Sequence, residues 1–330
     1  MPLVDSTYAP PPFLSSGHMQ TLVASLARRV DFTYDRHERI DTPDGDFLDL
    51  FWAAPQEGGG SGSVPERVAV LTHGLEGRAD RLYMRGMARA LTRRGWAVCA
   101  WNLRGCGEAM NRRPTTYHSG KTDDLEAVVS HVRGDGYDDI SLIGFSLGGN
   151  LTLKYLGERG AAVDDRVRGA VAFSVPVDLQ AASHQIARWT NGHYTAYFLR
   201  SLREKIRAKA RQHPTAVRPE ALSHVRTLRD FDDAYTAPLN GFRTADTYYR
   251  RASSNPLLPD IAVPTLLVNA ANDPFLAEAC YPRGAARESE CFTLEVPASG
   301  GHVGFVSLRG DEYWSERRAA SFLARCPGDA

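Results

Sequence analysis

Short runs of β-branched and apolar residues alternate with longer segments of helical periodicity along most of the chain. This alternation is typical of a mostly parallel β-sheet covered by helices on both faces. The first two runs are separated by Thr42–Asp46, whose Asp-Gly pair favours a hairpin turn, so we expect the sheet to begin antiparallel. Eight strands are predicted: Val30–Tyr34, Phe47–Ala53, Val68–Thr72, Ala97–Trp101, Ile140–Gly144, Ala170–Ser174, Thr265–Val268 and Phe292–Val296.

The strand pattern stops between about residues 177 and 255, where helix-forming stretches follow one another. We therefore predict an α/β core formed by residues 1–176 and 256–330, with a helical cap inserted at 177–255. The expected cap helices include Thr195–Arg211 and Arg218–Arg229. The polar segment Gln56–Ser63 is rich in Gly and Ser, and we expect it to be a flexible loop inside the core.

Two groups of residues in the predicted cap have more than one interpretation. A series of basic residues is interpreted as one stripe on a solvated helix face, with a site for anionic head groups as the less favoured alternative. A group of aromatic residues suits either an acyl-binding pocket or the small core of the cap itself. The basic residues are Arg200, Arg203, Lys205, Arg207, Lys209 and Arg211, and the aromatic residues are Trp189, Tyr194, Tyr197 and Phe198.

Composition narrows the functional classes. Among the 330 residues, Lys+Arg and Asp+Glu are equal at 39 each, so no basic excess points to a nucleic-acid partner. We find no signal peptide and no apolar stretch as long as a membrane span, which predicts a cytoplasmic protein and leaves only peripheral membrane contact open. The five cysteines lack C-x-x-C spacing, which argues against a disulfide framework or a thiolate metal site. Oligomeric state is left open.

Ser146 lies in Gly144-Phe145-Ser146-Leu147-Gly148, a G-x-S-x-G motif. Chance would produce such a motif in about one in six chains of this composition, so its setting has to decide. It follows an apolar strand and precedes a helical pattern, as a nucleophile elbow requires. The two glycines suit this turn because side chains there would collide with the strand and the helix. We therefore predict that Ser146 is a nucleophile.

A serine nucleophile needs a base, and the base needs an orienting carboxylate. His302 lies in a glycine-rich loop after the last predicted strand, and Asp273 directly follows the strand Thr265–Val268. The resulting order Ser146, Asp273, His302 is that of α/β hydrolases and differs from the chymotrypsin and subtilisin orders. The fallback bases are His18, His73 and His118, whereas Asp232, Asp233 and Asp260 are less well placed as the carboxylate.

Acyl transfer also needs donors for the developing oxyanion. The loop His73-Gly74-Leu75-Glu76-Gly77 follows a predicted strand, and its Leu75 amide is expected to pair with the Leu147 amide to form the oxyanion hole. His73 is interpreted as a residue that holds this loop by hydrogen bonds. Arg104, which follows the next strand, is interpreted as structural. The chemistry requires no metal or organic cofactor, and no metal-type spacing of His, Cys and carboxylate residues is found.

Seven short motifs together resemble the YheT/EMB8 branch of the α/β hydrolases, which includes animal abhydrolase-domain lipases. The resemblance spans nearly the whole chain. It implies esterase or acylglycerol-lipase activity on carboxylic esters, with a triad that maps onto Ser146, Asp273 and His302. The motifs are Gly17 to Thr21, His73 to Gly77, Asn102 to Gly107, Gly144 to Asn150, Ser254 to Leu258, Asn272 to Phe275 and Gly300 to Phe305.

The expected function is therefore serine carboxylic ester hydrolysis through an acyl-enzyme on Ser146, with a small-molecule or lipid ester as substrate. Two alternatives stay open. The same residues would serve an acyltransferase or a thioesterase, and a non-catalytic binding protein of the same fold is the less favoured interpretation.

Overall fold

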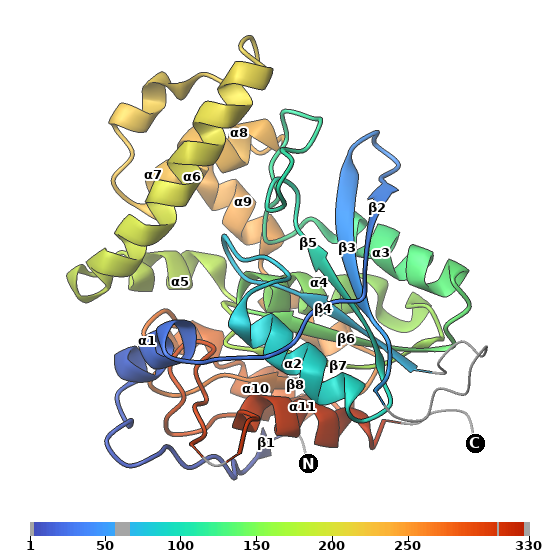
Figure 1. Cartoon of the computed structure of the whole chain (residues 1–330). Helices are drawn as coiled ribbons and strands as arrows, with labels where there is room; N and C mark the ends of the chain where they lie inside the picture. Colours follow the sequence, from blue (N-terminus) through green and yellow to red (C-terminus); the bar gives the residue numbers. More distant parts are fainter. Residues whose placement is uncertain (1–2, 57–66, 309, 327–330) are drawn as a thin grey trace.

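The computed structural model describes residues 3–56, 67–308 and 310–326 (Figure 1). They form a nine-stranded sheet in the order β1-β9-β8-β7-β6-β4-β5-β3-β2. Along this spatial order, every neighbouring pair from β1 through β9, β8, β7, β6 and β4 to β5 is parallel. The last two pairs, β5–β3 and β3–β2, are antiparallel. The strands are β1 Leu3–Val4, β2 Arg36–Asp41, β3 Phe47–Ala53, β4 Arg67–Thr72, β5 Ala97–Asn102, β6 Asp139–Phe145, β7 Val167–Phe173, β8 Thr265–Val268 and β9 Phe292–Glu295.

The predicted mostly parallel sheet is confirmed, and so is the antiparallel start, since Asp41 pairs with Phe47 across the turn that contains Gly45. The predicted strand Val30–Tyr34 is wrong, because this segment forms no strand. Its apolar side chains pack under a helix instead, and the Arg85 guanidinium binds the Phe32 carbonyl at 2.7 Å. The sheet instead gains β1 and β2. Of the predicted flexible loop, the part from residue 57 onward lies outside the described residues.

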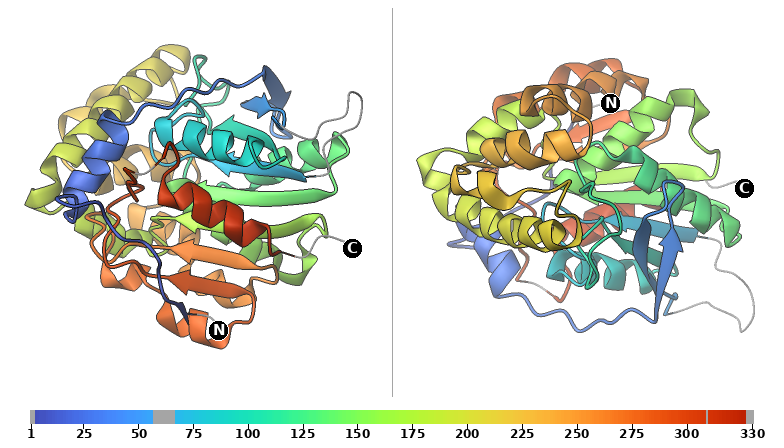
Figure 2. Two further views of the ribbon diagram at one scale, coloured as in Figure 1. Left: turned by 60° about the horizontal axis from the view of Figure 1, so that its bottom comes forward. Right: turned by 90° about the horizontal axis from the view of Figure 1, so that it is seen from above.

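Side chains from the two faces of the sheet form two separate hydrophobic clusters, as the alternation along a strand requires. In β4, Val68 and Val70 belong to one cluster, whereas Ala69 and Leu71 belong to the other. Helices α3 (Thr122–Gly134), α4 (Leu147–Arg159) and α10 (Arg283–Glu288) cover the first cluster. The second lies under α2 (Leu82–Thr92) and α11 (Trp314–Leu323), which lie side by side over the sheet in Figure 2.

Helices replace strands between β7 and β8, where the cap is predicted. Figure 1 shows α6 to α9 beyond one end of the sheet. The predicted helix Thr195–Arg211 lies within α6, but the predicted helix Arg218–Arg229 is wrong. There the chain forms a short 3₁₀ turn at Pro219–Ser223 and then starts a new helix at a Thr227–Asp230 capping box. The helices are α5 Leu179–Ile186, α6 Gly192–Gln212, α7 Leu228–Phe231, α8 Ala237–Leu239 and α9 Ala245–Ala252.

The amino-terminal segment crosses the molecule. It begins as β1 beside β9 and continues into α1 (Gly17–Leu26), which lies near the loops that follow β8 and β9 (Figure 2). Across the described residues, no helix is both long enough and apolar enough to cross a membrane.

Candidate active site

Ser146 occupies a sharp turn between β6 and α4. Its backbone has φ 53° and ψ −120°, a conformation that residues with a Cβ rarely adopt. A Cβ on Gly144 would lie 2.5 Å from the Gly148 carbonyl oxygen, and a Cβ on Gly148 would collide with the Thr72 and His73 carbonyls. Both flanking positions therefore require glycine, because any side chain there would collide with neighbouring backbone atoms.

His302 contacts both other predicted site residues. Its Nε2 lies 2.9 Å from Ser146 Oγ, and its Nδ1 lies 2.8 Å from Asp273 Oδ2 and 3.1 Å from Oδ1. The Asp273 side chain is fully buried and that of His302 is 10% exposed. Because a carboxylate only accepts hydrogen bonds, Nδ1 carries the imidazole proton and Nε2 is left to accept from the Ser146 hydroxyl. The loops after β6, β8 and β9 thus place the three side chains in one hydrogen-bonded chain.

The amino-terminal segment holds the loops of His302 and Asp273, a role that was not predicted. The His302 amide donates to Thr21 Oγ1 at 2.9 Å. The Asn272 side chain donates to the Ser15 carbonyl at 2.7 Å and accepts from the Gly301 amide at 3.0 Å. Thr21 belongs to a motif that carried the family resemblance, and this was the only available signal of its role.

The predicted oxyanion-hole residues lie beside Ser146. Leu75 and Leu147 border the same cleft as Ser146 and His302, and a Cβ on Gly74 would lie 3.0 Å from Ser146 Cβ. Within the described part of the chain, neither the Leu75 amide nor the Leu147 amide donates to a protein acceptor. Leu147 is also the first residue of α4, where the helix dipole favours negative charge. Both amides are therefore available to a ligand oxygen.

Glu76 anchors the Leu75 loop. It has a left-handed φ of 52°, its amide donates to the Tyr117 hydroxyl at 3.0 Å, and that hydroxyl donates to Glu76 Oε1 at 2.7 Å. Two residues of α6 complete the contacts, because Lys205 Nζ lies 2.7 Å from Glu76 Oε1 and the Ser201 hydroxyl donates to the same carboxylate. This positioning role was not predicted, since the partners lie far apart in sequence.

The fallback histidines have hydrogen-bond partners other than Ser146. His73 is fully buried, donates from Nδ1 to the Gly74 carbonyl at 2.8 Å and accepts from the Leu103 amide at 3.1 Å, so it holds its loop as expected. Burial lowers the pKa of His73 to about 3 and that of His118 to about 3. His18 lies 3.3 Å from the Tyr194 hydroxyl.

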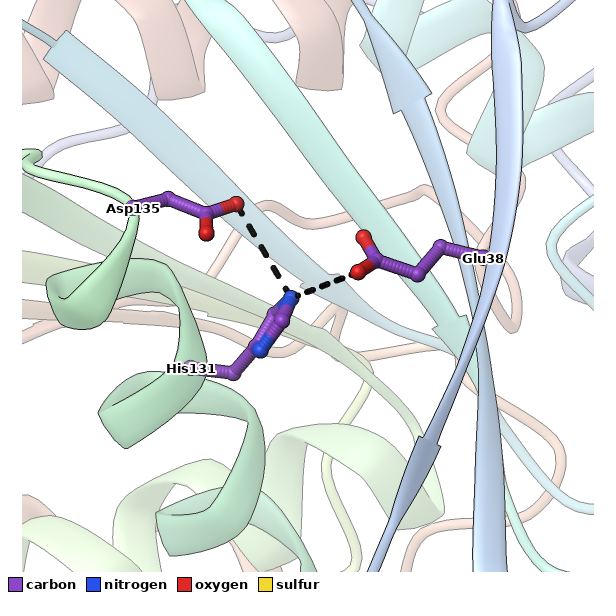
Figure 3. A group of neighbouring side chains, drawn as sticks. All are labelled: Glu38, His131 and Asp135. Carbon is purple, nitrogen blue, oxygen red and sulfur yellow. Dashed lines mark ion pairs between the residues drawn. The ribbon is translucent and has the colours of Figure 1, made fainter.

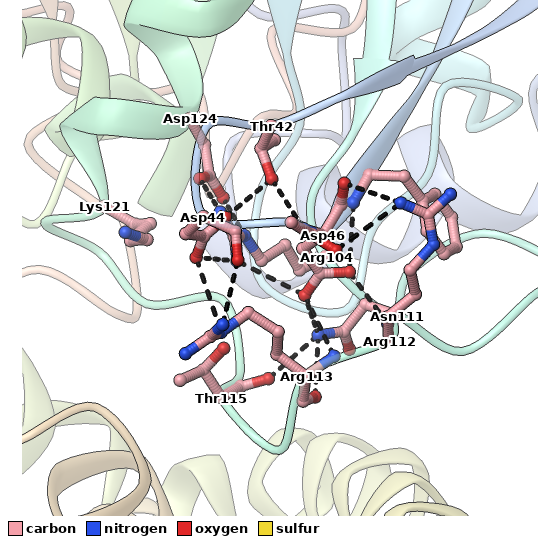
Figure 4. A network of polar contacts seen from close by, with 12 residues as sticks. Thr42, Asp44, Asp46, Arg104, Asn111, Arg112, Arg113, Thr115, Lys121 and Asp124 are labelled. Atoms are coloured by element: carbon pink, nitrogen blue, oxygen red, sulfur yellow. Dashed lines mark hydrogen bonds and ion pairs between the residues drawn. The ribbon is translucent and has the colours of Figure 1, made fainter.

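Arg104 has structural partners, in agreement with its predicted role (Figure 4). Its guanidinium is 1% exposed and forms paired hydrogen bonds with Asp124 at 2.6 and 2.7 Å and with Asp44 at 2.8 and 3.0 Å. It also contacts Asp46 at 3.3 Å. The hydrogen bonds from Arg104 hold the pKa of the Asp44 carboxyl well below its usual value. The network fastens the β2–β3 turn to the loop after β5.

A cleft opens at Ser146 and His302 and extends under the helical segment. Of the four aromatic residues with an open role, Phe198 borders it, whereas Trp189 and Tyr197 are 91% and 55% exposed. Tyr194 is buried and packs against Phe275, with ring centroids 4.7 Å apart. The apolar walls that this helical segment supplies include Leu179, Ala182, Ile186, Leu202, Ile206, Leu228 and Phe231.

A group of ligand-type side chains lies at the edge of the sheet, where β2 meets the end of α3 (Figure 3). His131 Nε2 is 3.2 Å from Glu38 Oε1 and 3.8 Å from Asp135 Oδ2. Arg36 already pairs with both carboxylates, at 3.1 and 3.8 Å. The guanidinium therefore supplies the positive charge that a metal ion would otherwise provide, and we interpret the group as an ion-pair network.

Comparisons with known proteins identify the family of the chain. A family model described as the alpha/beta hydrolase fold matches residues 70–307. YheT of Escherichia coli (strain K12), an esterase by name, is 34% identical over 315 residues, which cover 94% of this chain and 90% of that protein. Phospholipase ABHD3 of Mus musculus is 29% identical over 309 residues, which cover 92% and 74%. The structure of the Pyrococcus furiosus esterase Pf2001 has a TM-score of 0.61 at 20% identity, covers 90% of this chain and 92% of that chain, and shows the shared fold.

These matches confirm the resemblance inferred from the motifs, because similarity to YheT extends over nearly all of both chains. The relatives are hydrolases of esterase and lipase type, which supports a hydrolase function for the cleft described above. The chain belongs to the α/β-hydrolase family and, within it, to the YheT/EMB8 branch.

Proposed function

We propose that this chain is a serine carboxylic ester hydrolase in which Ser146 is the nucleophile, His302 the general base and Asp273 the orienting carboxylate. The observation that carries the proposal is the position of His302, with Nε2 2.9 Å from Ser146 Oγ and Nδ1 2.8 Å from Asp273 Oδ2. A serine hydroxyl becomes an effective nucleophile only when such a base removes its proton during attack.

The proposed reaction has two steps. Ser146 Oγ attacks the ester carbonyl while His302 Nε2 takes the hydroxyl proton, and the Leu75 and Leu147 amides donate to the oxyanion. The tetrahedral intermediate collapses as His302 protonates the leaving alcohol, which leaves an acyl-enzyme on Ser146. Water then attacks the acyl group with His302 as base, and collapse returns the proton to Ser146 and releases the acid. Asp273 remains ionised and stabilises the imidazolium in both steps.

We assign substrate selection to a cap at residues 177–255 and the chemistry to a core of residues 1–176 and 256–330. The support is that α5, α6 and α7 supply apolar side chains to the cleft that Ser146 also lines. Substrates in this proposal are small-molecule or lipid esters, as the names of the esterase and lipase relatives suggest. A cytoplasmic location stays a prediction from the sequence.

The test is hydrolysis of p-nitrophenyl esters of increasing acyl length, with labelling by a fluorophosphonate probe. We expect Ser146→Ala or His302→Ala to lower kcat by roughly 10⁴-fold or more, and Asp273→Asn by roughly 10²- to 10⁴-fold. Ser141→Ala is a matched control, because this serine lies on β6, the strand that leads into Ser146, and its buried hydroxyl has no hydrogen-bond partner among the described residues. A Ser146→Ala protein that kept most of the esterase activity would refute the assignment.

Product analysis separates hydrolysis from acyl transfer by the same residues. Release of free acid in water supports a hydrolase. Acylation of an added alcohol with no free acid formed would identify an acyltransferase, and turnover confined to acyl-CoA would identify a thioesterase. Absence of both turnover and Ser146-dependent labelling would identify a non-catalytic binding protein.

A further inference from the structure

Helix α6 presents two lysines to the cleft. Phe198, Leu202, Lys205, Ile206 and Lys209 recur at spacings of three and four residues, and all five border the cleft. A helix places residues at these spacings on one face. Arg200, Arg207 and Arg211 lie on the exposed side of α6. The predicted single basic stripe is therefore wrong, because Lys205 and Lys209 face inward.

The charge of Lys205 is already compensated. Its ammonium group lies 2.7 Å from Glu76 Oε1 and 2.9 Å from Cys106 Sγ. The Glu76 side chain is 2% exposed and that of Lys205 is 21% exposed, so the pair is a partly buried ion pair beside the Leu75 loop. Because Glu76 already balances the charge of Lys205, a second anion would gain little from binding to this lysine.

Lys209 has no such partner. It is 2% exposed, and its ammonium group donates to the Arg113 carbonyl at 2.7 Å. Within the described residues it forms no ion pair with a carboxylate. Asp46 acts on it through space, but the oxygens of Asp46 already accept from the Arg104 and Asn111 side chains and the Arg112 amide (Figure 4).

A buried cation without a counter-ion is unfavourable unless a ligand supplies the negative charge. Burial lowers the pKa of Lys209 to about 8, and the nearby cations Arg104 and Lys205 act in the same direction, so the group is still mostly protonated at pH 7. An ammonium has three N–H donors, of which the Arg113 carbonyl uses one. The geometry leaves donors for an oxyanion in the cleft.

We propose that Lys209 forms an oxyanion-binding subsite in the cleft, so that the preferred substrates are esters that also carry a carboxylate or phosphate group. This inference rests on the proposed ester hydrolase function. The subsite is distinct from the oxyanion hole, because Lys209 lies one helical turn, about 6 Å along α6, from Lys205, and it is Lys205 that pairs with Glu76 beside the Leu75 loop. The substrate therefore carries its anionic group apart from the reacting carbonyl, with apolar atoms against Leu202 and Ile206 between them.

The test compares matched esters that differ only in charge. In the first arm, monomethyl esters of straight-chain dicarboxylic acids are compared with methyl esters of monocarboxylic acids of equal length. In the second arm, acyl glycerol phosphates are compared with the corresponding acyl glycerols. The two arms separate a carboxylate from a phosphate as the source of the oxyanion.

For the wild type we expect kcat/KM to favour the anionic ester in at least one arm by about 10- to 100-fold, as a charged hydrogen bond allows. Lys209→Met should abolish this preference through KM while it leaves hydrolysis of the neutral ester within about twofold, and Lys209→Arg should keep most of the preference. Arg207→Met removes the same charge from the exposed side of α6 and should change neither ester.

Three results would overturn the subsite. These are an absence of preference in both arms, a preference that survives Lys209→Met, or an equal loss for neutral and anionic esters in a folded Lys209→Met protein. In each case, continued hydrolysis of neutral esters would leave the proposed function intact. Loss of turnover and of fluorophosphonate labelling in the wild type would refute the proposed function itself.

Discussion

Replacement of Lys209 by methionine should make the protein more stable at neutral pH. Lys209 is 2% exposed, and its pKa is lowered from 10.5 to about 8, chiefly by burial. A change of this size corresponds to about 3 kcal/mol against the charged form. Water in the cleft screens part of this cost, and loss of the hydrogen bond to the Arg113 carbonyl costs about 1 kcal/mol. We therefore expect Lys209→Met to raise the free energy of unfolding by about 1–2 kcal/mol at pH 7.

The pH dependence follows from the direction of the pKa change. A lysine whose pKa is lower in the folded protein than in the unfolded chain destabilises the fold fully below pH 8, where both states are charged. This cost fades between pH 8 and 10.5 and disappears above 10.5, where neither state is charged. The advantage of Lys209→Met should therefore shrink over the same interval.

Urea unfolding of the wild type, Lys209→Met and Arg207→Met at several pH values between 7 and 10.5 measures this directly. The Arg207→Met control changes an exposed position, so its stability should stay within about 0.5 kcal/mol of the wild type at every pH. The reasoning fails if Lys209→Met is less stable than the wild type at pH 7, or if its advantage is independent of pH.

Three further substitutions probe the rest of the structure. Arg104→Met should lower the free energy of unfolding by roughly 3–5 kcal/mol, because Asp46 and Asp124 lose a buried cation, and a loss below about 1 kcal/mol in chemical denaturation would contradict this. Gly144→Ala should abolish soluble folding or fluorophosphonate labelling. The control Gly134→Ala, with nothing within 4 Å of its added Cβ, should keep both and raise the free energy of unfolding by about 0.5–1 kcal/mol. Equal behaviour of the two variants would refute the steric account. Thr21→Val should lower kcat about tenfold with little change in KM, and Thr21→Ser should restore it, because the His302 amide needs this hydroxyl; kcat within twofold of the wild type would argue against the role.

The central sheet could be predicted because most of its strands are buried on both faces and appear in the sequence as short apolar runs. Thr265–Val268 and Phe47–Ala53 were predicted with the bounds that the structure has. The two strands that were missed give no such signal. The edge strand β2 is polar and largely exposed, and β1 has only two residues. The predicted strand Val30–Tyr34 failed because apolar residues also occur where an extended segment packs beneath a helix.

The candidate site could be predicted from the sequence because of the topology of the sheet. Ser146, Asp273 and His302 each follow a strand of a parallel sheet, so their loops meet at its carboxyl edge and their order along the chain identifies the arrangement. Contacts between distant segments had no comparable signal, as the Glu76–Ser201 pair shows.

The inward position of Lys205 and Lys209 could have been predicted from the sequence. Residues at alternate positions of a helix point about 200° apart, so they cannot share one face. Spacings of three and four residues place the two lysines on one face with Leu202 and Ile206, which are apolar and buried.

The contacts of the amino-terminal segment determine when the protein can become active as it is synthesised. Leu3 pairs with Leu294, and Thr21 contacts a residue 281 positions later. At about 5–20 residues per second, a ribosome needs roughly 15–60 s to cover that interval. Ser146 is made 156 residues before His302, so the serine exists before the later residues of the site, among them its base, have been added. A nascent chain that still lacks those residues carries the serine without its base and cannot cleave an ester by this route.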